Sequence, residues 1–419
     1  MTAAGPPPVA AVLPFVAMLL AIALCPLRAP SWWASNRNKL AVSLVLGLPI
    51  LALYAVRRPG ALLSMGEEYV SFILLLAGLF VISGGILLRG DLVATPLTNT
   101  GFLAAGSVLA SFVGTTGASM LLVRPLLQTN RERTRVKHTV IFFIFLVSNI
   151  GGMLTPLGDP PLFLGYLQGV PFAWTFGLWR QWALMVGLLL VLYVVWDTRE
   201  YAREPLAALR RDRARVAPLR IRGALNALGL AGMVLAVAFL HAPWREAAIL
   251  GLAGASLWLT PREVRRANGF TWSPIVEVAV IFFGIFLTMI PALELLRLRG
   301  GELGVRAPWQ FFWAAGILSS FLDNAPTYLA FLALGQGLRL PAEIVGVPGA
   351  ILVAISVGAV AMGANSYIGN APNFMVKSIA EEAGVKMPSF FGYMLYSGAI
   401  LIPLFLLVTW LFFLSGSPG

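Results

Sequence analysis

One apolar stretch in the first half of the chain carries an interruption that a regular transmembrane helix could not hold. Apolar residues fill 140–147 and 162–167, and the segment 148–161 between them contains three prolines, several glycines and the carboxylate of Asp159. Proline and glycine disfavour helix interiors, and lipid cannot hydrogen-bond the backbone groups that the break frees. Protein or a water-filled cavity must therefore surround the break, and such a feature at mid-membrane usually marks a transport site.

The interrupted stretch recurs in the second half of the chain. Residues 152–163 align with 363–374, a shift of 211 positions, and two glycines, one proline and a phenylalanine are identical. A second pair of segments, 111–117 and 320–326, is related by a shift of 209 positions. Both shifts are close to half of the 419 residues, so the sequence predicts two copies of one membrane unit.

Composition restricts the class of protein. The chain is 58% hydrophobic and 11% charged, with a mean hydropathy of +0.84, which excludes a soluble globular protein and indicates a polytopic helical membrane protein. The net charge of +12 does not indicate nucleic-acid binding here, because most basic residues lie in short loops between apolar runs. One cysteine and two histidines exclude a disulfide framework and a cysteine- or histidine-based zinc site.

The predicted fold class is an all-α polytopic membrane protein with two inverted repeats, each of five transmembrane helices and one re-entrant hairpin, and with discontinuous helices at the centre. The first repeat covers 1–198, a basic cytoplasmic linker covers 199–222, and the second repeat covers 223–419. The two hairpins are expected at about 97–127 and 308–337, because each has a polar tip between two apolar arms. The predicted spans are 10–28, 39–56, 68–88, 138–168 (broken), 172–196, 223–241, 246–260, 273–296, 342–383 (broken) and 389–415.

Charge gives a prediction of sidedness. An odd number of crossings in each repeat makes the second copy insert upside down. When the loop at 197–222 is placed in the cytoplasm, 20 of the 30 lysines and arginines fall on the cytoplasmic side and 8 on the other. This follows the positive-inside rule and puts both termini on the outer side. We expect a protein of a bacterial-type inner (plasma) membrane, with a first helix that is retained because no basic residue precedes it.

Asp159, in the first break, has two compatible interpretations. An ionisable side chain near the membrane midplane is costly, so it is a candidate site for a cation or a proton. Asp159 also precedes Pro160 and Pro161, which suits the N-cap of a half-helix. Asn370 occupies the matching position in the second break, and it would cap equally well.

Asp323 lies at the tip of the second predicted hairpin, where the first copy has Gly114. Because the shared fold does not require a carboxylate there, Asp323 is a candidate for proton coupling together with Asp159. The alternative is a tip that only meets water at the membrane surface. If the tip reaches the midplane, burial would favour proton exchange at this carboxyl.

Neutral oxygens accompany both aspartates. Side-chain and backbone oxygens near the ends of half-helices commonly hold a dehydrated Na⁺, although the same residue types also cap helices and bridge them. A possible Na⁺ site would use Thr115, Asn149, Asp159, Asp323 and Asn324. The full set of candidate ion- or substrate-binding residues is Thr115, Thr116, Ser148, Asn149, Gly158, Asp159, Asp323, Asn324, Asn365, Gly369 and Asn370.

The motifs at these positions resemble the ion transporter superfamily, and most closely its branch of NhaD-like sodium:proton antiporters, with arsenite and citrate or dicarboxylate transporters as relatives. The resemblance implies inverted repeats, two hairpins facing two broken helices, and an elevator-type movement of that unit, often within a dimer. Dicarboxylate members carry Ser-Asn-Thr at both hairpin tips, whereas this chain has Gly-Thr-Thr and Asp-Asn-Ala, which points away from carboxylate transport. The motifs that carry the resemblance are 114–119, 148–152, 156–161, 322–326 and 368–373.

The leading functional hypothesis is a secondary cation (Na⁺):proton antiporter, and not an enzyme, because two acidic groups lie at predicted site positions without an arginine beside either motif. The alternative is transport of an organic anion such as citrate or a dicarboxylate, or of arsenite, with half-helix N-termini holding the negative charge. A remote alternative is an intramembrane aspartyl protease, since 157–159 matches part of a Gly-x-Gly-Asp signature. The repeat argues against it, because Asn370 stands where a second aspartate would be needed.

The remaining expectations concern cofactors and partners. No cofactor is expected, apart from Na⁺ as a transported ion, and no phosphate-binding Gly-x4-Gly-Lys-Ser/Thr loop for ATP-driven transport is present in the sequence. The expected partners are membrane lipids, a small ion substrate and a second copy of the chain in a homodimer, with no nucleic acid. The linker 199–222 is predicted to be a charged connector that touches anionic head groups, and the alternative is a regulatory or partner-binding role.

Overall fold

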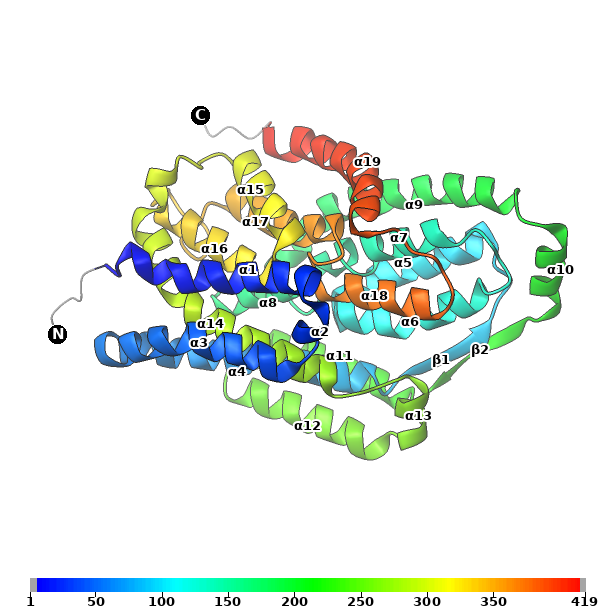
Figure 1. Cartoon of the computed structure of the whole chain (residues 1–419), viewed down its shortest axis with the longest axis horizontal. Helices are drawn as coiled ribbons and strands as arrows, with labels where there is room; N and C mark the ends of the chain where they lie inside the picture. The colour runs from blue at the N-terminus through cyan, green and yellow to red at the C-terminus, as the bar shows by residue number, and fades with distance from the viewer. Residues whose placement is uncertain (1–5, 415–419) are drawn as a thin grey trace.

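The computed structural model describes residues 6–414, and the arrangement of its helices is shown in Figure 1. Within this range, eight helical segments are long and apolar enough to cross a membrane, which confirms the all-α polytopic membrane fold. Their main helices are α1 (Leu13–Arg28), α3 (Asn36–Arg57), α4 (Pro59–Ser83), α5 (Pro96–Val113), α7 (Lys137–Leu146), α9 (Trp179–Tyr201), α14 (Ser273–Arg299) and α19 (Phe390–Val408). The number and inverted orientation of the repeats stay predictions.

An outer group of helices joins the two halves of the chain. Helix α14 packs along α3 and α4, and α4 also packs against α11 (Leu225–Phe239) and α12 (Trp244–Leu259). The hydroxyl of Ser43 on α3 donates to the backbone oxygen of Val280 at 2.9 Å, and Tyr69 on α4 donates to that of Ala279 at 2.9 Å. These hydrogen bonds join helices from the two halves of the sequence, so both halves contribute to the outer group.

An inner group of helices holds the predicted hairpins and breaks. The first hairpin is α5 with α6 (Thr115–Thr129), and the second is α15 (Pro308–Phe321) with α16 (Asn324–Gly337). The first break separates α7 from α8 (Pro160–Leu167), and the second separates α17 (Gly349–Met362) from α18 (Ala371–Glu382). Apart from Lys137, every residue of α7 is buried, so protein rather than lipid surrounds this helix on all sides.

Two predicted spans were wrong at their ends. The predicted span 68–88 belongs to helix α4, which begins earlier, at Pro59, and ends earlier, at Ser83. Gly84 and Gly85 follow the helix, and the chain continues as strand β1 (Leu87–Asp91). The predicted broken span 342–383 becomes helical only at Gly349. Before it lies a turn with a positive φ at Val345 and at Gly346, followed by Pro348, and this backbone cannot continue a helix.

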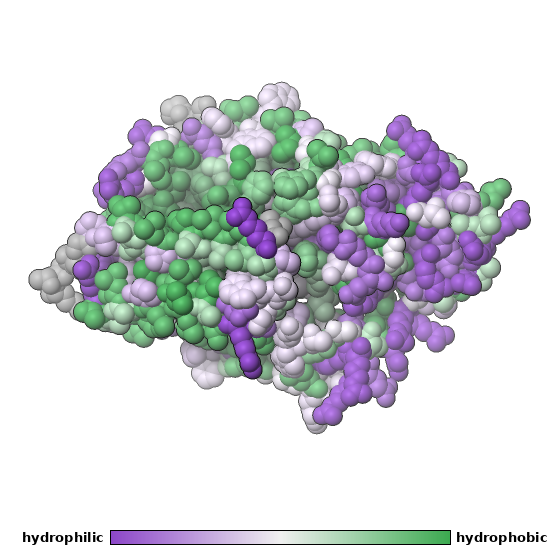
Figure 2. Space-filling model, viewed as in Figure 1, coloured by the Kyte–Doolittle hydropathy of each residue, from purple (hydrophilic) through white to green (hydrophobic). Residues whose placement is uncertain are grey.

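The predicted linker 199–222 has a structure of its own. It contains the short helix α10 (Leu206–Ala214) and strand β2 (Ala217–Arg222), which pairs antiparallel with β1. Nearby lies α13 (Arg262–Ala267), and the remaining short helix, α2 (Pro30–Trp33), follows α1. Hydrophilic side chains concentrate at the end of the molecule that carries α10, β1 and β2, whereas hydrophobic ones cover α1 and α3 (Figure 2). We call the former the basic end.

The closest packing in the inner group predicts a stability effect. A Cβ at Gly358 of α17 would collide with the backbone oxygen of Phe312 on α15, so Gly358→Ala must push the two helices apart. We expect a loss of about 1–3 kcal/mol in the free energy of unfolding, the usual cost of overpacking, measured by thermal unfolding of the purified protein. Gly398→Ala in α19 is the matched control, because nothing lies within 4 Å of its added Cβ. Equal unfolding temperatures of the two variants would contradict this packing.

Candidate transport site

Each break ends in the residue at the N-cap position of the following half-helix, but the side chain of that residue makes no capping hydrogen bond. Asp159 and Asn370 have extended backbones directly before α8 and α18, and a proline stands in the first turn of each helix. Neither side chain accepts a hydrogen bond from the helix that follows it. Pro160 and Pro161 have no amide hydrogen to offer Asp159. The polar groups of Asp159 and Asn370 are therefore available to other segments.

Four segments converge on the carboxylate of Asp159. Thr115, the first residue of α6, donates its hydroxyl to Oδ1 at 2.9 Å, and Asn370 of the second break donates Nδ2 to the same oxygen at 3.1 Å. Asn324, the first residue of α16, donates Nδ2 to Oδ2 at 2.5 Å. Asp159 itself is 1% exposed. Two hairpin tips and two helix breaks thus meet at one buried carboxylate, and the side chains that donate to it, Thr115, Asn324 and Asn370, are all neutral.

Further hydrogen bonds join the two breaks directly. The side-chain amide of Asn149 donates to Oδ1 of Asn373 at 2.7 Å, and that of Asn370 donates to the backbone oxygen of Ser148 at 3.1 Å. The hydroxyl of Ser148 lies 2.9 Å from that of Ser119 on α6. The first break is therefore held between the first hairpin and the second break.

Each hairpin also satisfies the backbone of its neighbouring break in the same way. In the first half, Ser111 donates its hydroxyl to the backbone oxygen of Gly151, and its own backbone oxygen accepts from the hydroxyl of Thr155. In the second half, Ser320 donates to Met362 and accepts from Ser366. The polar backbone groups that a broken helix frees thus find partners on the facing hairpin, as a membrane interior requires.

Gly158 and Gly369 make these compact breaks possible. A Cβ at Gly158 would collide with the backbone oxygen of Gly152, and a Cβ at Gly369 would lie 2.5 Å from the backbone oxygen of Gly363. The backbone oxygen of Gly158 also accepts from the amide of Thr115 at 2.8 Å. Only glycine allows the chain to fold back this closely.

Asp323 and Thr116 lie beside this cluster rather than within it. Asp323 is partly exposed, and its Oδ1 accepts from the amide of Ala325 at 3.0 Å, which makes it the N-cap of α16. The next residue, Asn324, contacts Asp159 instead. The hydroxyl of Thr116 makes no hydrogen bond with other residues in 6–414. A role for Asp323 in proton coupling stays a prediction.

The sequence that forms this site is similar to a known family over nearly its whole length. A family model with the description "Putative citrate transport" matches residues 6–413, nearly the whole chain. The chain belongs to this family. No curated protein matches the chain. Family and fold together identify an integral membrane transporter rather than an enzyme, and they support the predicted relationship to citrate transporters. Membership of the NhaD-like branch stays a prediction.

In this member of the citrate-transport family, three of the buried amide oxygens that have no hydrogen-bond donor within residues 6–414 belong to the breaks and the second hairpin tip. They are Oδ1 of Asn149, Asn324 and Asn365, which lie in the first break, at the second hairpin tip and in the second break. Nδ2 of Asn365 donates to the hydroxyl of Ser320 at 2.9 Å, which orients its amide. Buried oxygens without donors are costly for a protein, but they are suitable ligands for a desolvated cation.

The oxygen atoms that could bind a metal ion here suit a monovalent cation better than a tightly held divalent metal. Within residues 6–414, no three histidine, cysteine, aspartate or glutamate residues form a group that could hold a metal ion. One carboxylate with several neutral oxygens matches the low charge of Na⁺, whereas Ca²⁺ sites usually collect several carboxylates. The predicted Na⁺ ligands Thr115, Asn149, Asp159 and Asn324 are compatible with this chemistry.

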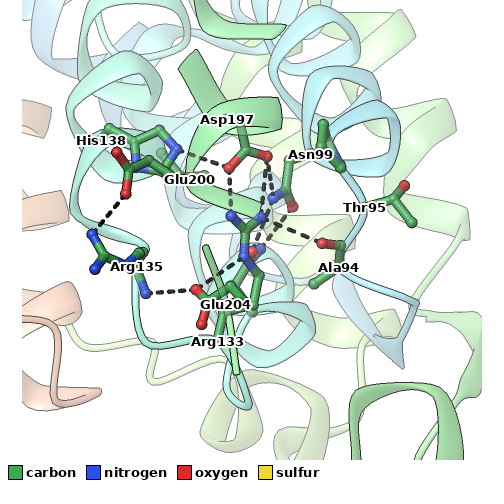
Figure 3. Close-up of polar contacts among 12 residues, drawn as sticks. Ala94, Thr95, Asn99, Arg133, Arg135, His138, Asp197, Glu200 and Glu204 are labelled. Carbon is green, nitrogen blue, oxygen red and sulfur yellow. Dashed lines mark hydrogen bonds and ion pairs between the residues drawn. The ribbon is translucent and has the colours of Figure 1, made fainter. Parts of the chain in front are cut away.

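A second buried polar cluster, at the basic end, was missed by sequence reasoning (Figure 3). The guanidinium of Arg133 donates to both carboxylate oxygens of Asp197, at 2.6 and 3.1 Å, and Nε2 of His138 lies 2.8 Å from the same carboxylate. Glu204 accepts from the backbone amides of Thr134 and Arg135 at 3.0 and 2.8 Å. Here the opposite charges pair, unlike at Asp159. No sequence spacing signals this pairing, because Arg133 and Asp197 lie on separate segments.

The environment of Glu204 makes its contribution to stability depend on pH. Burial would raise the pKa of this carboxyl, but hydrogen bonds from Thr134 and Arg135 and the charge of Arg133 outweigh burial and hold the pKa below its ordinary value of 4.5. A carboxyl whose pKa falls on folding stabilises the folded state above its unfolded pKa. That stabilisation is lost as the pH falls through the folded pKa.

Glu204→Gln tests this cluster. We expect the variant to lose about 1–3 kcal/mol of stability at pH 7, the usual effect of removing one partner from buried hydrogen bonds, and the difference from wild type to shrink below pH 4.5. Thermal unfolding at several pH values measures both effects. Glu302→Gln serves as the control, since Glu302 is exposed and pairs with Arg299 on the surface. A difference from wild type that is independent of pH would contradict the assigned charge state of Glu204.

Proposed function

We propose that this chain is a secondary transporter that carries a citrate-like polycarboxylate together with at least one cation, and that the cation binds at Asp159. Family membership supports the anion, since the matching family is described by citrate transport. Both hairpin tips and both breaks converge on one buried carboxylate, and this observation is the main support for a cation site at Asp159.

The balance of charge explains why the two solutes would travel together. Thr115, Asn324 and Asn370 contact Asp159, and none of them carries a positive charge. A polycarboxylate approaching this centre would be repelled by the ionised Asp159 in a medium of low dielectric constant. A bound cation removes that repulsion. The N-terminal ends of the half-helices α8 and α18 then supply partial positive charge for the anion.

The same contacts suggest how cation binding would change the site. Asn324 and Asn370 donate their amide nitrogens to Asp159, and a cation on that carboxylate would compete with both donors. Rotation of either amide by half a turn would present its oxygen to the cation instead. Because Asn324 belongs to the second hairpin and Asn370 to the second break, a bound cation would tie both segments to the first break. The predicted elevator-type movement would carry this tied inner group past the outer helices.

Cation:proton antiport, with Na⁺ as the cation, is the second candidate. The observation in its favour is that Asp159 is buried among neutral partners, so a proton and Na⁺ could compete for one carboxylate. In that mechanism Asp323 would be a second proton site, as the sequence predicts. The two candidates differ in whether an organic anion is moved.

The expected partners and location complete the proposal. Membrane lipids surround the outer helices, and we propose a homodimer in a bacterial-type inner membrane with the basic end in the cytoplasm. Both termini would then lie on the outer side, as the distribution of lysine and arginine predicts.

Reconstituted vesicles test the proposal. We expect radiolabelled citrate uptake to depend on an inward gradient of Na⁺ or protons, and Asp159→Asn to lower the initial rate on the order of a hundredfold, because an essential buried charge is lost. Asp323→Asn should keep most of the uptake, since asparagine also caps helices. Uptake by Asp159→Asn at the wild-type rate would remove this carboxylate from the mechanism.

A pH-sensitive dye inside the vesicles separates the two candidates. Na⁺, Li⁺, K⁺, citrate and arsenite are added in turn. Proton movement with Na⁺ alone, abolished in Asp323→Asn and without citrate uptake, would establish the antiport candidate instead.

A further inference from the structure

An open cavity of about 420 Å³ lies at the basic end, apart from the contacts of Asp159. One wall is the segment between α6 and α7, and the other is the segment after α18, at 383–386. None of the side chains that contact Asp159 lines it. The volume falls within the range of about 300–1,000 Å³ that is typical of small-molecule sites. The cavity is large enough for a phosphate- or carboxylate-bearing group.

The charges that line the cavity are all positive. Arg131, Arg133, Lys137 and Lys386 lie along its walls, and no aspartate or glutamate does. The charge of Arg133 is already matched by Asp197 and Glu204, and that of Arg131 lies 3.4 Å from Glu132. The cavity therefore has two unmatched charges at most, those of Lys137 and Lys386.

Lys137 and Lys386 are free to serve a ligand. Both are exposed, and neither side chain forms an ion pair or hydrogen bond with any residue in 6–414. They stand on opposite walls of the same cavity. Two ammonium groups facing one cavity repel each other, and a shared anion would relieve this repulsion.

The start of α7 adds to the positive potential. Lys137 is the first residue of this ten-residue helix, and Val136, which precedes it and lines the cavity, cannot cap it with a side chain. The N-terminal end of a helix carries partial positive charge and free amide donors. The opposite wall contains the C-terminal end of α18, which carries partial negative charge, and Lys386 beyond that end supplies the positive charge of this wall.

We propose that this cavity is a second binding site, which takes a multivalent oxyanion between Lys137 and Lys386. The shared chemistry is that of clustered phosphate or carboxylate oxygens. An anionic lipid head group and a soluble anion both offer it. The site does not depend on the proposed transport function, because it shares no residue with the Asp159 cluster.

Binding of inorganic pyrophosphate to the full-length protein in detergent tests the site. At low ionic strength, where surface charges are weakly screened, we expect saturable binding that weakens about tenfold in the double variant Lys137→Gln/Lys386→Gln. The variant Lys137→Arg/Lys386→Arg should retain binding, because it keeps both charges. Arg211→Gln/Arg213→Gln is the matched control, as it removes two exposed charges from α10 at the same end. Thermal unfolding verifies that each variant is folded.

Nanodiscs distinguish the two sources of the oxyanion. If a lipid head group occupies the site, pyrophosphate should bind wild-type protein more weakly in discs that contain phosphatidylglycerol than in discs of phosphatidylcholine alone, and this difference should vanish in Lys137→Gln/Lys386→Gln. Equal affinity in both discs, with the loss in that variant preserved, identifies a soluble occupant. The proposal is overturned if the glutamine variant binds like wild type, or if the α10 control weakens binding equally.

Discussion

The structure depends on how the freed backbone groups of two broken helices are satisfied inside a membrane. A break in lipid would leave amides and carbonyls without partners, and each would cost several kcal/mol. Here the facing hairpins supply the partners: Ser111 and Ser320 each donate to a backbone oxygen of the neighbouring break, and the amide of Thr115 donates to the backbone oxygen of Gly158. The hairpins are consequently essential to the structure of the site. They are the reason that broken helices, and with them the buried Asp159, can exist within this membrane fold.

Two buried carboxylates in this protein illustrate different uses of charge. Asp197 faces the guanidinium of Arg133 in a two-point contact, so its charge is permanently neutralised and the cluster holds loops and helices together. Asp159 is surrounded by a hydroxyl and two amides, so its carboxyl group accepts hydrogen bonds but has no opposite charge among these contacts. An opposite charge built into the protein would make a cation at Asp159 unnecessary. In our proposal a mobile cation takes this role, because no opposite charge is among those contacts, and this is the basis of coupled transport.

Much of the fold and part of the candidate site could be predicted from sequence. Glycines and prolines within apolar runs mark the breaks, and the internal alignment places Asp159 opposite Asn370. Sequence could not decide between Asp323 and its neighbour Asn324, because successive residues at a helix start point about 100° apart and the orientation is set by tertiary packing. Nor could it reveal the strands, whose partners are distant in the chain, or the pairing of Arg133 with Asp197. The residue types at the hairpin tips argued against carboxylate transport, whereas the family match over residues 6–413 favours citrate as the substrate class.

The small sheet at the basic end changes what the connection between the two halves can do. Strand β2 pairs with β1 directly after α4, with Leu87 opposite Arg222, and Asn226 at the start of α11 donates to the backbone oxygen of Gly85 at 3.0 Å. Asp212 of α10 accepts from the amide of Ala94 at 3.0 Å. The connecting segment is therefore not a flexible linker: its contacts fix the start of the second half against the first. These contacts, and not only the peptide linkage, hold the start of the second half in register with the first.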